Sequence, residues 1–181
     1  FARLIADEVD RVNTFMRELL NFGQESPAPP MACRLRDLLD EAAALAQSGA
    51  EAAGQQCPAI ERQYGETPAI LLQRDRVIRA LTNVIANAIE AAGAQGRIWL
   101  RTSLEGLPPK AFAIAEIAND GPPIAEEDIE RIFEPFFTTK PKGTGLGLAI
   151  AFQIVAQNGG RMSAQSSETI TRFQAAFPAP Q

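Results

Sequence analysis

The chain has 181 residues, of which 46% are hydrophobic and 22% are charged, as expected for a folded globular protein. A net charge of −5 at pH 7, without a basic run, argues against nucleic acid or an anionic membrane as a partner, and no apolar run is long enough to span a bilayer. The sequence has no histidine, and Cys33 and Cys57 have neither redox nor metal-ligand spacing. These features predict a cytoplasmic protein with reduced thiols that binds proteins or nucleotides.

Apolar residues alternate at spacings of three and four through the first part of the chain, at Ala2, Ile5, Val9, Val12, Met16 and Leu19. This spacing predicts a helix over residues 1–22 whose apolar seam packs on another helix, in a coiled-coil or four-helix-bundle homodimer. The alternative is that the seam docks on its own domain. Because the chain begins inside this pattern without a methionine, we expect it to be part of a longer protein.

A proline-rich break, Glu25–Pro30, follows the predicted helix and cannot continue it. We therefore predict three parts: a helical segment over residues 1–24, a linker over 25–31, and a domain over 32–181.

The first half of that domain alternates helical and extended patterns. Helix formers with helical spacing predict a helix over Arg34–Ala46, and alternation predicts a strand over Cys57–Tyr64, followed by a short apolar run at Pro68–Leu72. A second helix is expected from Asp75, as its N-cap, to Gly93.

Asn83 and Asn87 lie four residues apart on this second helix, so both amides point to the same side. Asparagines among apolar neighbours are costly unless they are hydrogen-bonded. With Glu90 beside them, a ligand or metal site is favoured over a purely structural network.

Two adjacent strands, Arg97–Leu104 and Ala111–Ala118, are predicted to form a hairpin. The second strand runs into Asn119-Asp120-Gly121-Pro122-Pro123-Ile124, a polar turn of the kind that commonly displays binding residues. An Asx-type turn without a ligand is the alternative.

A short helix is predicted over residues 126–132, and Phe133, Phe136 and Phe137 follow it as core residues or as anchors of a moving loop. Alternating glycines then precede a helix over Leu146–Val155, an arrangement that can turn backbone N–H groups and a helix N-terminus towards an anion. The chain ends in a predicted hairpin formed by residues 162–166 and 170–177.

The order of these motifs resembles the catalytic ATP-binding domain of bacterial sensor histidine kinases, a branch of the gyrase-like (Bergerat) ATPase superfamily. The segment Phe133–Leu148, and Glu8–Val12 with Leu19–Phe22, look most like the nitrogen-regulation type. The resemblance implies an α+β fold, a two-layer sandwich with helices on one face of a mixed sheet, preceded by a dimerisation helix.

The resemblance also implies ATP and Mg²⁺ as ligands. Asn87 matches the family's magnesium ligand, and Asn83 matches its companion, which contacts the phosphates or the ion. Lys140 and Lys142 would neutralise the triphosphate, and Asn83 and Lys140 are the residues implied to be catalytic. The residues implied to bind ATP are Asn83, Asn87, Glu90, Asn119, Asp120, Gly121, Ile124, Phe133, Phe137, Thr138, Thr139, Lys140, Lys142, Gly143, Thr144, Gly145, Leu146, Gly147 and Leu148. Because a lid must admit nucleotide, residues 138–144 are expected to be poorly ordered without it.

One departure concerns the adenine site. Aligning Gly121 puts Asn119 where the family commonly carries an aspartate, and Pro123 where it carries a glycine. Asn119 can accept through its amide oxygen. Asp120 is the rival candidate, because a register shift of one residue would turn it to the base instead.

The implied activity is transfer of the ATP γ-phosphoryl group to a histidine on an upstream dimerisation domain, for relay to the receiver aspartate of a response regulator. Since the chain has no histidine, we expect it to bind ATP without phosphorylating itself. The alternatives are a degenerate nucleotide-sensing module, a serine kinase of the anti-sigma type without a dimerisation helix, and a gyrase-like ATPase. The ATPase is disfavoured because Asn83 stands where those proteins have a water-activating glutamate.

Overall fold

The structure is a computed structural model that describes residues 28–107, 110–140 and 143–180. The helix predicted over residues 1–22 and most of the linker lie outside these ranges, so the dimerisation helix and the domain boundary remain predictions.

Five strands form the main sheet, in the order β2-β4-β5-β7-β6. Their bounds are Ala59–Tyr64 for β2, Arg97–Glu105 for β4, Phe112–Asn119 for β5, Thr171–Pro178 for β7 and Arg161–Ser166 for β6. β2 runs parallel to β4, whereas the other three neighbouring pairs are antiparallel. The predicted mixed sheet is therefore confirmed, as are the hairpins β4–β5 and β6–β7.

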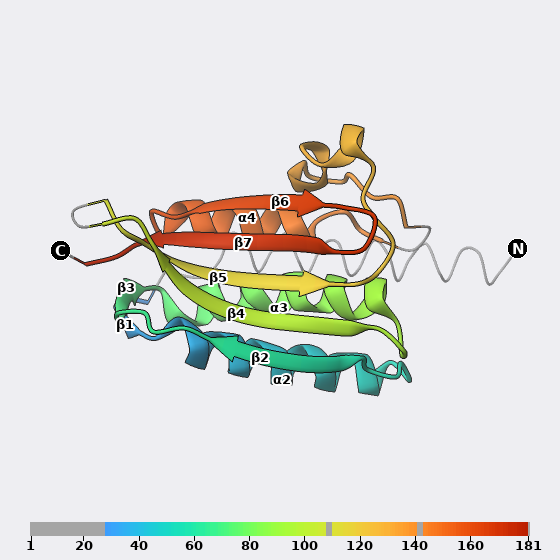
Figure 1. Ribbon diagram of the computed structural model, residues 1–181, viewed down its shortest axis with the longest axis horizontal. Helices are drawn as coiled ribbons and strands as arrows, with labels where there is room; N and C mark the ends of the chain where they lie inside the picture. Colours follow the sequence, from blue (N-terminus) through green and yellow to red (C-terminus); the bar gives the residue numbers. More distant parts are fainter. Residues whose placement is uncertain (1–27, 108–109, 141–142, 181) are drawn as a thin grey trace, which may run out of the picture.

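Three α-helices in the described residues cover one face of this sheet (Figure 1). They are α2 (Leu35–Ala52), α3 (Arg74–Ala92) and α4 (Gly147–Gln157). The middle helix, α3, contacts both α2 and α4. This arrangement confirms the predicted α+β two-layer sandwich.

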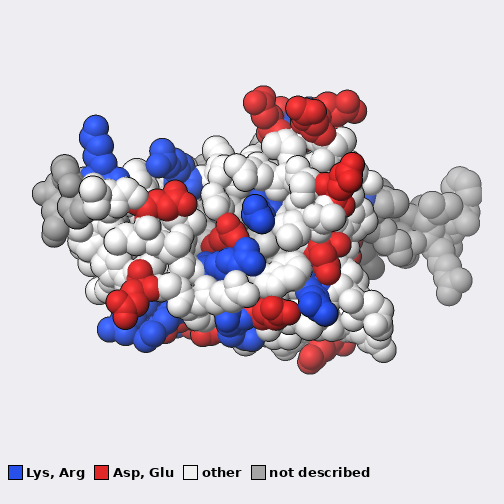
Figure 2. All heavy atoms as spheres, viewed as in Figure 1, with Lys and Arg blue, Asp and Glu red and all other residues white. Residues whose placement is uncertain are grey.

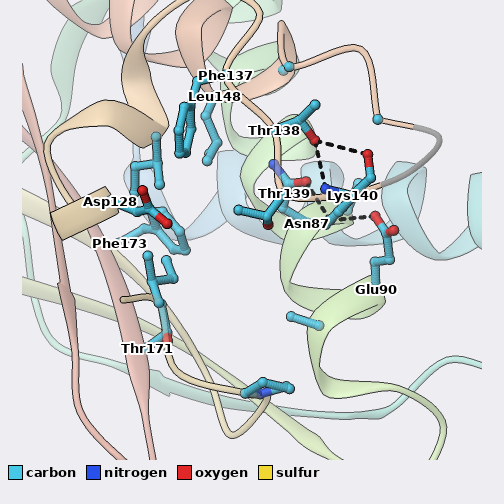
Figure 3. A pocket seen from close by; sticks show the side chains of 18 of the residues that line it. Asn87, Glu90, Asp128, Phe137, Thr138, Thr139, Lys140, Leu148, Thr171 and Phe173 are labelled. Carbon is cyan, nitrogen blue, oxygen red and sulfur yellow. Dashed lines mark hydrogen bonds and ion pairs between the residues drawn. The ribbon is translucent and has the colours of Figure 1, made fainter. Parts of the chain in front are cut away.

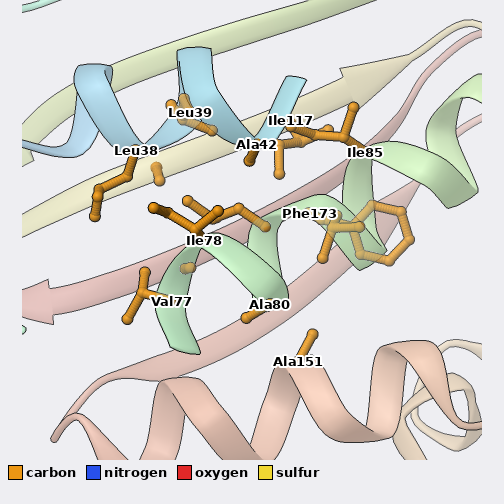
Figure 4. Packing of buried hydrophobic residues seen from close by; sticks show 14 of the residues in the cluster. Leu38, Leu39, Ala42, Val77, Ile78, Ala80, Ile85, Ile117, Ala151 and Phe173 are labelled. Atoms are coloured by element: carbon orange, nitrogen blue, oxygen red, sulfur yellow. The ribbon is translucent and has the colours of Figure 1, made fainter. Parts of the chain in front are cut away.

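The core lies between the helices and the sheet (Figure 4). Leu39 of α2, Ile85 of α3 and Ile117 of β5 are each at most 1% exposed and belong to one cluster. Small residues, Ala42 on α2 and Ala80 on α3, are also buried in it, which allows the helices to approach closely. Complete burial of each large apolar side chain stabilises the fold by about 1.5–3 kcal/mol, so α3 is held firmly along its core face.

Charged side chains of both signs are interspersed on the outer face of the sheet (Figure 2). Arg101 of β4 pairs with Glu116 of β5 at 2.8 Å, and the amide of Gln174 on β7 donates to the same carboxylate at 2.9 Å. This face is a solvated, charge-paired surface across neighbouring strands.

Long-range contacts added one strand and changed one predicted helix. A strand that the sequence did not indicate, β1 (Met31–Cys33), pairs with β3 (Ile70–Leu72) in a small antiparallel sheet. The helix expected over 126–132 is instead two 3₁₀ turns, η1 (Glu126–Asp128) and η2 (Arg131–Phe133). The second turn buries Ile132, and Phe133 packs against the ring of Phe152 on α4 with centroids 5.2 Å apart.

The start of α3 also differs from the prediction. Its N-cap residue is Gln73 rather than Asp75, and no side chain caps the helix. The backbone N–H of Gln73 donates to Oδ1 of Asn158, at the end of α4, at 2.8 Å. At this helix end the structure therefore has a contact with a distant residue, Asn158, where the sequence predicted a local cap by Asp75.

Candidate functional site

A cavity of about 820 Å³ opens between α3, the end of β5, β7 and the segment that leads into α4. Asn83, Asn87 and Glu90 from one side of α3 all line it. The structure thus brings the two asparagines to the same space, as their spacing predicted.

A lysine reaches across the cavity to α3 (Figure 3). Nζ of Lys140 donates to Oδ1 of Asn87 at 3.2 Å and to Oε2 of Glu90 at 2.5 Å. The hydroxyl of Thr138 accepts the backbone N–H of Lys140 at 3.1 Å. We call Asn87, Glu90 and Lys140 the lysine cluster; it places a cation beside an amide oxygen and a carboxylate.

The first turn of α4 faces the same space, because Gly147 and Leu148 line the cavity. Nδ2 of Asn83 donates to the carbonyl of Gly147 at 3.1 Å, which ties α3 to this turn. The positive end of a helix and its unpaired N–H groups attract anions. The lysine cluster and this helix end together favour a negatively charged group.

The loop between η2 and α4 is closed at its base. The backbone N–H of Phe136 donates to the carbonyl of Gly145 at 2.9 Å, and both residues have positive φ values, 71° and 69°. A Cβ on Gly145 would come within 2.4 Å of the Phe136 carbonyl carbon. Glycine is therefore required at position 145.

Two buried polar residues stand at the end of the sheet that borders the cavity. Asn119 is 1% exposed, Thr171 is 3% exposed, and the two lie opposite each other in the β5–β7 pair. Hydroxyls of Thr171 and Ser166 are hydrogen-bonded at 2.7 Å, and the Ser166 oxygen accepts the backbone N–H of Ile124 at 2.9 Å. We call Asn119 and Thr171 the amide–hydroxyl pair.

Apolar side chains complete the walls between the lysine cluster and the amide–hydroxyl pair. They include Ile124, Phe137, Leu148 and Phe173. The guanidinium of Arg131 lies 4.4 Å from the centroid of Phe137 and so holds that ring by a cation–π contact. Such walls suit a planar, apolar ring system with polar groups at its edges.

Most of the residues predicted to bind a ligand do line the cavity. They are Asn83, Asn87, Glu90, Asn119, Ile124, Phe137, Thr138, Thr139, Lys140, Gly143, Thr144, Gly145, Gly147 and Leu148.

Four predicted residues do not line it. Oδ1 of Asp120 accepts the backbone N–H of Arg97 at 2.7 Å, and a Cβ on Gly121 would meet the Ala91 carbonyl. Phe133 packs on α4, and Leu146 is buried in the core. Lys142 lies outside the described residues, so the expectation about disorder over residues 138–144 stays a prediction.

Asp128, Thr171 and Phe173 line the cavity but were not predicted. Thr171 and Phe173 lie on β7 and reach the site only because β7 pairs with β5. A polar residue opening an apolar strand was the available signal for Thr171. Asp128 belongs to an acidic run, Glu126–Asp128, and such a run is typical of a solvent-exposed turn.

The described residues contain no group of three or more His, Cys, Asp or Glu side chains that could hold a metal. The oxygens of Asn87 and Glu90 are nevertheless of the kind that Mg²⁺ takes, and Mg²⁺ commonly relies on phosphates and water for its remaining ligands. Asn87 and Glu90 therefore fit Mg²⁺ that enters with a phosphate ligand. In this structure the ammonium of Lys140 lies against their oxygens.

The cysteines add no chemistry to this site. Both are free, as expected, and burial raises the pKa of the Cys33 and Cys57 thiols, which keeps them protonated and unreactive. Among the described helices, none combines the length and apolar character needed to cross a bilayer.

Comparison with known proteins gives a consistent result. The family model described as histidine kinase-, DNA gyrase B-, and HSP90-like ATPase matches residues 72–181. The sensory histidine kinase/phosphatase NtrB of Rhizobium leguminosarum bv. phaseoli is 31% identical over 98% of the chain and 49% of its own length. The sensor histidine kinase ZraS of Escherichia coli (strain K12) is 33% identical over 92% of the chain and 35% of its own length. The chain thus spans about half or less of these relatives.

Among solved structures, a nucleotide-free catalytic domain of the histidine kinase ThkA aligns with a TM-score of 0.70 and 30% identity, over 84% of this chain and 97% of that one. A complex of ThkA with the response regulator TrrA aligns with a TM-score of 0.72 and 28% identity, over 98% of this chain and 50% of the ThkA chain.

Proposed function

Because this chain belongs to the histidine kinase-, DNA gyrase B-, and HSP90-like ATPase family, we propose that its cavity binds ATP with Mg²⁺ and serves a protein-histidine kinase. The observation that carries the proposal is the lysine cluster near the N-terminal turn of α4, in a cavity that also has apolar walls. The cluster and the turn would bind the triphosphate, and the apolar walls would hold the base.

Asn87, with the Glu90 carboxylate nearby, would hold the magnesium ion, which neutralises charge on the phosphates when bound. Nζ of Lys140 bonds to the oxygen of Asn87, so this ammonium has to move before that oxygen can bind a metal. From the loop closed by Phe136 and Gly145, Lys140 can turn to the phosphates instead. Asn83 would fix the turn of α4 against which the phosphates lie.

Phosphoryl transfer asks mainly for positioning and charge neutralisation, which these residues can supply. The acceptor histidine has to come from elsewhere, since the chain contains none. We infer that it stands on a dimerisation domain joined through residues 1–22, and that the phosphate passes to a response regulator in the cytoplasm. The ThkA–TrrA complex supports this partner.

An ATPase that activates water with a side chain at position 83 is not favoured. Asn83 has no carboxylate, and its Nδ2 is bonded to Gly147. A nucleotide sensor without transfer activity and a serine kinase of the anti-sigma type remain as rivals.

The experiment is a calorimetric titration of the chain with ATP, with and without Mg²⁺. We expect Mg²⁺-dependent binding, and Asn87→Ala should weaken it by roughly ten- to hundredfold, the value of a hydrogen bond or ligand contact to a charged group. Thr82→Val is the matched control, because Thr82 lies on α3 outside the cavity and its hydroxyl donates to the carbonyl of Ile78. Absence of ATP binding, or equal loss in both variants, would contradict the proposal.

Transfer is tested separately with γ-labelled ATP. The chain alone should incorporate no label, whereas a longer form of the protein that carries an upstream histidine should. ATP binding without transfer in that longer form would favour the nucleotide sensor.

A further inference from the structure

Nδ2 of Asn119 is the single buried side-chain nitrogen or oxygen among the described residues that lacks a hydrogen-bond partner. The residue is 1% exposed and lines the cavity. Buried donors are almost always paired, because an unpaired one loses its bond to water without compensation. The orphaned N–H therefore points to an acceptor that a ligand or an ordered water brings.

Thr171, the cross-strand partner of Asn119, gives this end of the cavity a second adaptable group. Its hydroxyl shares a hydrogen bond with Ser166 in which either oxygen can be the donor. A carboxamide has one acceptor and two donor hydrogens, and a hydroxyl both donates and accepts. The amide–hydroxyl pair is thus electrically neutral and can match either kind of partner.

The carboxylates of Asp120, Glu90 and Asp128, in or next to this cavity, each have a partner already. Asp120, next in the sequence to Asn119, does not line the cavity and accepts the N–H of Arg97. Glu90 is paired with Lys140, and Asp128 with Arg131 at 3.4 Å. The amide of Asn119 is therefore the group best placed to read the edge of a base.

The difference between an amide and a carboxylate matters for that edge. A carboxylate only accepts, so it bonds to the 6-amino group of adenine and repels the 6-oxo group of hypoxanthine. A carboxamide accepts from the amino group through Oδ1 and donates to the oxo group through Nδ2.

We propose that Asn119 makes this site tolerant at position 6 of the purine, so that it binds ATP and ITP with similar affinity. This inference rests on the proposed nucleotide site. ITP is the appropriate probe because it differs from ATP at position 6 and in the protonation of the neighbouring ring nitrogen.

The test is a pair of calorimetric titrations, of ATP and of ITP, each with Mg²⁺. The two dissociation constants should agree within about tenfold in the natural chain, and Asn119→Asp should widen their ratio by about tenfold or more in favour of ATP. Asp120→Asn is the matched control, because an amide oxygen can still accept the Arg97 N–H, and it should leave the ratio unchanged.

A preference for ATP beyond about hundredfold in the natural chain would overturn the inference, whether or not the Asn119→Asp variant folds. An unchanged ratio in an Asn119→Asp protein with a normal thermal melt would do the same. So would a ratio that shifts in Asp128→Asn instead, since Asp128 would then read the base. Binding of ATP without ITP removes this inference alone, whereas binding of neither nucleotide removes the proposed function with it.

Discussion

The two faces of α3 have different roles. On one face Leu81, Val84 and Ile85 are at most 2% exposed and pack between the other helices and the sheet. On the other face Asn83 and Glu90 line the cavity. The packed face keeps the helix in place, and the polar face can therefore present ligands without contributing much to folding. Substitutions on the two faces should separate stability from binding.

The largest expected effect is on the core face. Ile85→Ala should lower the free energy of unfolding by about 2–5 kcal/mol, because it removes buried methyl groups and leaves a cavity. Urea denaturation measures the change. Ile85→Val, the matched control, should cost about 0.5–1.5 kcal/mol. If Asn87→Ala lowered the free energy of unfolding as much as Ile85→Ala, the distinction between the two faces would be wrong.

The loop opposite the polar face gives an intermediate effect. Gly145→Ala should weaken ATP binding by about tenfold or more, because a Cβ at this φ collides with the Phe136 backbone and strains the closed base of the loop. Gly159→Ala is the control, since Gly159 also has a positive φ, of 74°, but lies outside the cavity, and its Cβ would have no neighbour within 4 Å. Fluorescence titration with a labelled ATP analogue reports both. Equal binding in the two variants would contradict the role given to Gly145.

The smallest effect is expected at the lysine cluster. Lys140→Met should raise the dissociation constant for ATP by several-fold to about tenfold and reduce its dependence on salt, because one cation near the phosphates is lost. The free energy of unfolding should change by less than about 1 kcal/mol, since the pair with Glu90 is substantially exposed. Lys110→Met, outside the cavity, is the control. An unchanged salt dependence would remove Lys140 from the phosphate site.

Local patterns were sufficient for much of the fold. The apolar spacing on α3 predicted both its core face and the common side of Asn83 and Asn87, because side chains three or four residues apart share a helix face. Alternation likewise identified both hairpins. Local reasoning was wrong about the cap of α3, where a contact with Asn158 of α4 replaced the expected Asp75.

The residues that line the cavity around Asn119 could not all be predicted from the sequence. Thr171 and Phe173 follow Asn119 by some fifty residues, and only the β5–β7 pairing brings them beside it. Similarly, β1 has too few residues to give a pattern, and it exists as a strand because β3 lies next to it.

The main helices and hairpins, the order of the motifs and the family that they resemble could all be inferred from the sequence alone, because helical and strand periods and glycine requirements are local properties of a chain. Which of Asn119 and Asp120 lines the cavity depended on the tertiary structure. Neighbouring residues at a strand end point in different directions, and a register shift of one would exchange them. Pairing with β4 and β7 fixed that register, with the amide in the cavity wall and the carboxylate on the backbone of Arg97.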